Sequence, residues 1–119
     1  MAVSDVDQLI QTSLLGEAAE NASVGVFVAD EDGRYIAVNQ AGCTLLGYER
    51  DELLGLLVTD SSPLADAPER YRNAVVAGEL FGTTKALRKD GTELEVEFWT
   101  CTTQVAQMTV YVSFVRRTG

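Results

Sequence analysis

The apolar residues of this chain recur at different spacings, and the changes in spacing divide the chain into segments. Over residues 4–20 they recur at helical spacing behind two possible N-cap residues, Ser4 and Asp5, which predicts an N-terminal helix. The run VGVFVA at 24–29 is short and almost wholly apolar, as expected for a strand covered on both faces. A second run, RYIAV at 34–38, follows an Asp-Gly pair, so the two runs predict a β-hairpin.

The middle of the chain predicts short helices. Asn39 is a good N-cap, and the segment that it opens ends at Gly47, a residue type that commonly terminates helices. The segment ERDELLG at 49–55 predicts one or two further helical turns. Residues 56–68 contain both prolines and predict an irregular loop, and a helix over roughly 68–78 is expected after it.

The last third of the chain is rich in β-branched and aromatic residues and predicts three antiparallel strands, at 80–89, 92–103 and 108–117. An Asp-Gly pair at 90–91 joins the first two, and a turn near Gln104–Gln107 is expected between the last two. The element order predicts an α+β domain in which short helices cover one face of a five-stranded antiparallel sheet.

Composition and charge narrow the classes of function. The chain has 119 residues, enough for one domain, with 9 basic and 18 acidic residues and no histidine. The acidic excess argues against nucleic-acid or anionic-membrane partners, and no apolar run is long enough to span a bilayer. The missing histidine removes the commonest general base and the commonest haem and zinc ligand. The first residues do not resemble a signal peptide, and the chain has two cysteines. Together these features predict a cytoplasmic protein whose cysteines are free thiols.

Two features of the sequence, an acidic segment and a cysteine, could indicate chemical sites. Asp30, Glu31 and Asp32 precede Gly33, but the ligand positions of a calcium loop are not filled around that glycine, so the segment predicts an exposed turn and no metal site. Cys43 has no histidine to activate it and is expected to pack as a small hydrophobe. Catalytic residues are therefore not predicted.

The order of elements, the hairpin V-x-V-x-D-x-D-G-R and the segments VNQAGCTLLGYERDELLG and LRKDGTELEVEF resemble a PAS domain. The resemblance covers about residues 18–117 and suggests a PAS domain at 21–119 behind an amphipathic flanking helix at 1–20. It implies a sensory module of bacterial or eukaryotic signalling proteins, here taken as bacterial and two-component-like, and not an enzyme. The implied partners are a second copy and a fused or separate kinase, cyclase or transcription regulator.

The same resemblance implies a small cavity between the sheet and the helices. Alternation in ELEVEFWTC places Leu94, Val96, Phe98 and Thr100 on one strand face, which is expected to face the cavity. On the last strand, the resemblance assigns Tyr111, Ser113 and Val115 to that side. The full set of predicted cavity residues is Phe27, Ala29, Leu46, Tyr71, Val75, Thr84, Ala86, Val96, Phe98, Thr100, Tyr111, Ser113 and Val115.

The last strand is apolar on both faces, so its outer face predicts an exposed apolar patch. The N-terminal helix is the expected cover, and a second copy would complete the burial; alternatively, the helix alone covers the patch. The predicted dimer-interface residues are Leu9, Ile10, Leu14, Leu15, Trp99, Val110, Val112 and Phe114.

Motifs of known PAS ligands can be compared with the chain. Where flavin-binding light-sensing (LOV) domains carry the photoreactive cysteine, this chain has Val58, and the flavin-contacting amides correspond to Ala86, Val96 and Val115. A LOV-type flavin and a histidine-ligated haem are therefore not expected. A small apolar or amphipathic ligand is the favoured occupant, with a filled, ligand-free core as the alternative. Two other functions stay open: a purely structural dimerisation module, and a cone-shaped isomerase-like enzyme with a carboxylate in its cavity.

Overall fold

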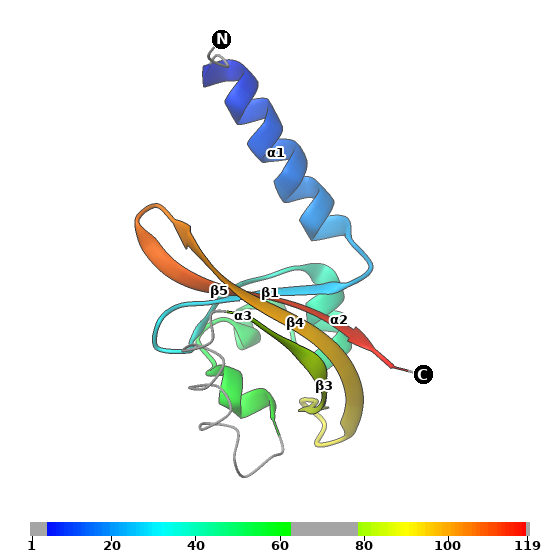
Figure 1. Ribbon diagram of the computed structural model, residues 1–119. Coiled ribbons are helices and arrows are strands. Elements are labelled where there is room, and N and C mark those ends of the chain that lie inside the picture. The colour runs from blue at the N-terminus through cyan, green and yellow to red at the C-terminus, as the bar shows by residue number, and fades with distance from the viewer. Residues whose placement is uncertain (1–4, 63–78, 119) are drawn as a thin grey trace.

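The computed structural model describes residues 5–62 and 79–118 (Figure 1). The predicted helix over 68–78, with Tyr71 and Val75, lies outside the described residues. The described elements are α1 (Asp5–Asn21), β1 (Gly25–Ala29), β2 (Tyr35–Val38), α2 (Gln40–Leu46), α3 (Arg50–Leu53), the 3-10 helix η1 (Val58–Ser61), β3 (Glu79–Leu87), β4 (Glu93–Val105) and β5 (Met108–Arg117). Among these described helices, none is long and apolar enough to cross a membrane.

The five strands form one antiparallel sheet in the order β2-β1-β5-β4-β3. The pairing of β1 with β5 joins segments from the two ends of the chain at the centre of the sheet. Helices α2, α3 and η1 lie on one side of the sheet, and α1 extends away from it (Figure 1). The predicted α+β architecture is confirmed, and its core forms between the inner sheet face and α2 and α3, around Phe27, Leu46, Leu53 and Val96.

The acidic segment after β1 is a turn, as predicted. The Asp30 carboxylate oxygen Oδ1 accepts hydrogen bonds from the backbone N–H groups of Asp32 and Arg34, both at 3.0 Å. Gly33 has φ = 82°, a conformation that glycine adopts without steric cost. The carboxylate thus stabilises the local backbone of the β1–β2 hairpin.

The tip of the β3–β4 hairpin packs on the helices. The Lys89 N–H donates to the carbonyl oxygen of Leu46 at 2.9 Å, and the Lys89 ammonium pairs with Glu52 of α3. The Arg88 guanidinium lies beside Gly47, the residue that ends α2. Two cations therefore lie near the carbonyl end of α2, where the helix dipole favours positive charge.

Helix α1 differs from its prediction. Its side chains are exposed from Val6 to Ala19, with Leu9 and Leu15 at 68% and 72% exposure. The apolar residues are spread around the helix axis, because six residues correspond to about 1.7 turns and place Leu9 and Leu15 on different sides. The prediction of an amphipathic stripe is wrong, and so is the alternative in which this helix alone covers the outer sheet face.

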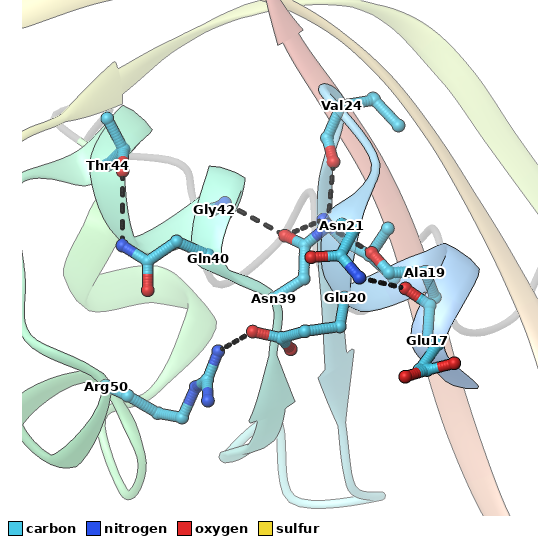
Figure 2. Close-up of polar contacts among 11 residues, drawn as sticks. Glu17, Ala19, Glu20, Asn21, Val24, Asn39, Gln40, Gly42, Thr44 and Arg50 are labelled. Atoms are coloured by element: carbon cyan, nitrogen blue, oxygen red, sulfur yellow. Dashed lines mark hydrogen bonds and ion pairs between the residues drawn. The ribbon is translucent and has the colours of Figure 1, made fainter. Parts of the chain in front are cut away.

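The buried carboxamide of Asn39 ties α1 to the rest of the fold (Figure 2). Its oxygen accepts from the N–H groups of Gly42 and Val26, both at 2.9 Å. Its nitrogen donates to the carbonyl oxygens of Ala19 at 2.7 Å and Val24 at 2.9 Å. One side chain therefore caps α2 and holds β1, the end of α1 and the segment between them.

A contact beside this carboxamide adds to the attachment. Glu20, near the end of α1, forms an ion pair with Arg50 of α3 (Figure 2). Both side chains are about 40% exposed, so solvent and salt weaken the attraction between them. The buried carboxamide is therefore the stronger of the two links.

Replacing Asn39 by Asp is expected to lower the free energy of unfolding by about 2–4 kcal/mol. The substitution keeps both acceptor bonds but removes both donors, and it leaves the carbonyls of Ala19 and Val24 facing a carboxylate. Urea denaturation followed by circular dichroism measures the loss. Gln40→Ala, at the exposed neighbouring position, is the matched control and should change stability by less than about 0.5 kcal/mol. Equal stabilities of the two variants would contradict this role.

The last hairpin turn is tighter than predicted. Strand β4 continues to Val105 and β5 begins at Met108, so only Ala106 and Gln107 connect them. Both have positive φ, 50° and 67°, as in a type I′ turn. Side chains other than glycine and asparagine are disfavoured in this conformation, at a cost of about 1–2 kcal/mol per residue.

The double substitution Ala106→Asn with Gln107→Gly is therefore expected to raise the free energy of unfolding by about 1–2 kcal/mol. Thermal and urea denaturation give the change. Ala106→Val serves as the opposite control, because a β-branched residue is strained at this φ and should destabilise the hairpin. A double variant no more stable than the parent would rule out the left-handed turn.

Candidate ligand cavity

A cavity of about 200 Å³ lies between the inner face of the sheet and the helices α2 and η1. Every predicted cavity residue in the described part of the chain contributes to its walls. The described lining residues are Phe27, Ala29, Tyr35, Leu46, Val58, Thr59, Ser61, Ser62, Leu80, Thr84, Lys85, Ala86, Val96, Phe98, Thr100, Tyr111, Ser113 and Val115.

The sequence prediction missed the wall formed by Tyr35 and η1. The sheet register shifts between Val28 and Ala29, so that Ala29 pairs with Tyr35 and the tyrosine side chain is buried. The backbone of Tyr35 also exchanges hydrogen bonds with Leu56 and Gly55. These bonds bring residues 56–62, predicted as an irregular loop, against the cavity. The sequence held only a weak indication that Tyr35 points inward, namely that its strand follows an almost wholly apolar strand in the predicted hairpin.

Two hydroxyl groups and one carbonyl group are linked by hydrogen bonds where η1 forms the cavity wall. The Tyr35 hydroxyl lies 2.8 Å from the Ser61 hydroxyl, and the Ser61 hydroxyl donates to the Val58 carbonyl oxygen at 2.9 Å. Burial raises the pKa of Tyr35 to about 12. The side chain is therefore a neutral phenol at physiological pH.

A second hydroxyl pair lies on the sheet. Thr100 of β4 and Ser113 of β5 are directly opposite each other, and their hydroxyl oxygens are 2.7 Å apart. Both side chains are half-buried and line the cavity. These two polar groups of the predicted wall are thus hydrogen-bonded to each other.

The remaining lining is mostly apolar. Among the described lining residues Lys85 is the only one that carries a formal charge, and it lies on β3 opposite Glu95 of β4. Aspartate and glutamate are missing from the described part of the wall, so the isomerase-like alternative finds no general base there. The arrangement suits reversible binding of a small neutral molecule.

Cys43 packs in the core beside α2, as predicted, with 3% exposure. Burial raises the pKa of its thiol, which disfavours the reactive thiolate. The side chain therefore acts as a small hydrophobe in the core.

The outer face of the sheet carries a row of aromatic side chains. Phe81 of β3 is opposite Trp99 of β4, which is opposite Phe114 of β5, and the Trp99 and Phe114 ring centroids are 6.0 Å apart. Phe81 is 76% exposed and Trp99 49%. Phe81 was not among the predicted interface residues, although its alternation with Leu80 could have revealed it.

Val110 departs from the predicted outer patch. It is 1% exposed and is therefore already buried within a single chain. Val112 and Phe114, from the same strand face, are half-buried. Period-2 alternation assigns a strand face, but burial on that face depends on neighbours that the pattern does not reveal. The exposed apolar surface therefore centres on Trp99 and Phe81.

Comparison with known proteins identifies the family. A family model described as PAS domain matches residues 23–115. The fold is similar to that of a PAS domain from a two-component sensor histidine kinase, with 19% identity and a TM-score of 0.81 over 93% of this chain and 99% of that one. Curated proteins contain no match to the sequence.

Two further solved structures are similar at higher identity. One is the PAS domain of an HTR-like protein from Haloarcula marismortui, with 26% identity and a TM-score of 0.79 over 93% of this chain and 95% of that one. The other is a domain of the sensory box sensor histidine kinase/response regulator from Geobacter sulfurreducens, with 25% identity and a TM-score of 0.78 over 95% and 99%.

The family match spans most of the chain and includes β1, α2, η1 and most of β5, which contribute residues to the cavity wall. Solved PAS domains share the same arrangement of the sheet and helices. This chain belongs to the PAS domain family.

Proposed function

We propose that the chain is the sensor of a cytoplasmic signal-transduction protein, that it binds a small, largely apolar molecule in its cavity, and that it acts as a homodimer on a fused or separate effector. The apolar cavity with hydroxyl groups on two of its walls is the observation that carries this proposal. A kinase, cyclase or transcription regulator is the class of effector proposed. The similarity to PAS domains of sensor kinases supports the kinase among them.

The lining argues for a ligand other than a LOV flavin. Val58 stands where a LOV domain carries its reactive cysteine, and it packs against the core. Ala86, Val96 and Val115 replace the flavin-contacting amides, and each lines the cavity with an apolar side chain. A cavity of about 200 Å³ is also below the range of about 300–1,000 Å³ typical of drug-sized ligands.

Two exposed apolar surfaces support dimerisation. Helix α1 carries exposed Leu9, Ile10, Leu14 and Leu15, distributed around its axis. A helix that is apolar on several sides is normally buried, and the aromatic row around Trp99 offers a surface for it. We infer that α1 of one copy packs against α1 and the outer sheet face of a second copy.

The contacts of α2 connect the cavity to that interface. Leu46 of α2 lines the cavity, and Asn39 caps α2 while it holds the end of α1. A ligand that displaces α2 would therefore alter the packing of α1. The coupling cannot exceed the difference in the ligand's affinity for the two arrangements.

A ligand-free dimerisation module is the second candidate, and the exposed α1 and aromatic row support it equally. Native mass spectrometry of the purified protein separates the two. A co-purifying small molecule, lost on substitution of the cavity wall, is expected for the sensor. The other candidate predicts a bare protein mass in every variant.

Ala86→Leu is expected to fill part of the cavity, because Ala86 is 8% exposed and lines it. The variant should lose the co-purifying molecule and keep or raise its melting temperature, since the added side chain replaces empty space. Thr83→Leu is the matched control on an exposed position of the same strand and should retain the molecule. Retention of the molecule by both variants would place it outside the cavity.

The double substitution Ile10→Glu with Leu14→Glu is expected to convert the dimer to a monomer, because charges at these exposed apolar positions resist burial. Sedimentation velocity over a concentration series measures the change. Gln11→Glu adds charge at an exposed polar position of the same helix and serves as the control. A parent protein that is monomeric at high concentration would refute dimerisation through α1.

A further inference from the structure

The direction of one hydrogen bond in the η1 wall follows from counting protons. The Ser61 hydroxyl has one proton, and it donates that proton to the Val58 carbonyl oxygen at 2.9 Å. In its contact with Tyr35, at 2.8 Å, the Ser61 oxygen must therefore be the acceptor. The Tyr35 phenol is thus the donor in this pair.

The Tyr35 oxygen keeps its capacity to accept a hydrogen bond. Its proton is committed to Ser61, and the described residues supply no donor to the phenol oxygen. The side chain is 7% exposed and lines the cavity, with its ring packed against Phe27 at a centroid distance of 5.5 Å. At this wall, the cavity presents a neutral acceptor that can take an O–H or N–H group from its occupant.

The hydroxyl pair on the sheet adds the complementary group. Thr100 and Ser113 together have two hydroxyl protons, and the bond between them uses one. The other proton can be donated to an occupant. Ser113 on β5 and Tyr35 on β2 are separated by β1, about 10 Å between the outer two strands. The donor and the acceptor therefore come from strands two positions apart in the sheet, with Phe27 of β1 between them.

We propose that the occupant is a small neutral alcohol or phenol whose O–H group donates to the Tyr35 oxygen and whose apolar body fills the space toward β4 and β5. This inference rests on the proposed ligand-binding function and names the class of ligand. An ionised molecule is disfavoured because the described wall offers no opposite charge at the hydroxyl groups, and the single lysine lies opposite Glu95. A ketone has no proton to donate to the Tyr35 oxygen and can use only the hydroxyl pair on the sheet.

Three probes of similar size test the class: benzyl alcohol, toluene and benzoate. Each is titrated into ¹⁵N-labelled protein, with the backbone signals of Ala29, Val96 and Val115 as reporters of cavity binding. Benzyl alcohol and toluene are expected to bind, and benzoate is not. Tyr35→Phe should weaken benzyl alcohol binding about threefold to tenfold and leave toluene binding unchanged or tighter, since only the alcohol uses the phenol oxygen.

Ser61→Ala is a second variant that retains the Tyr35 hydroxyl. With its acceptor removed, the Tyr35 proton becomes available to the cavity, so acetophenone, which can only accept, should gain affinity about threefold to tenfold over the parent. This gain of binding cannot arise from general destabilisation. It also tests the assigned direction of the bond independently of the phenylalanine variant.

The outcomes separate the two levels of the proposal. Binding of none of the probes to the parent protein overturns the ligand-binding function itself. If the probes bind in the cavity but Tyr35→Phe loses equal affinity for benzyl alcohol and toluene, the alcohol assignment alone is overturned. The same holds if the parent protein binds benzoate as tightly as benzyl alcohol. An unchanged acetophenone affinity in Ser61→Ala overturns the assigned direction of the Tyr35 hydrogen bond and, with it, the assignment.

Discussion

The buried carboxamide of Asn39 is the interaction on which the arrangement of this domain depends. Its two donors and two acceptor bonds are all used inside the protein, by the end of α1, the following segment, β1 and α2. A buried polar group is stabilising only when its hydrogen bonds are complete, and removal of one partner costs about 1–3 kcal/mol. The requirement to satisfy one side chain therefore positions four segments together.

The central strand pair determines the two surfaces of the sheet. Because β1 pairs with β5, the inner face assembles Phe27 and Ser113 from distant parts of the sequence around one cavity. On the outer face, the pairing of β5 with β4 places half-buried Phe114 beside exposed Trp99. The cavity wall and an apolar outer surface thus lie on opposite sides of a single layer.

Local patterns predicted much of this arrangement. The inward positions of Val96, Phe98 and Thr100 follow from alternation along β4, since neighbouring side chains in a strand point to opposite faces. The turn at Asp30 follows from the ability of its carboxylate to bond the backbone two residues on. Tyr35 was missed because a register shift in the β1–β2 pair, which no period reveals, sets its surroundings.

The sequence by itself determined the five strands, their phases and the helix cap at Asn39, because each of these depends on residues within a few positions of one another. Only the tertiary structure decided that α1 stands away from the sheet, that Val110 is buried, and that η1 faces Tyr35 across the cavity wall. These features depend on contacts between segments far apart in the chain. The direction of the Tyr35 hydrogen bond belongs to the same group, since it is set by a serine 26 positions away.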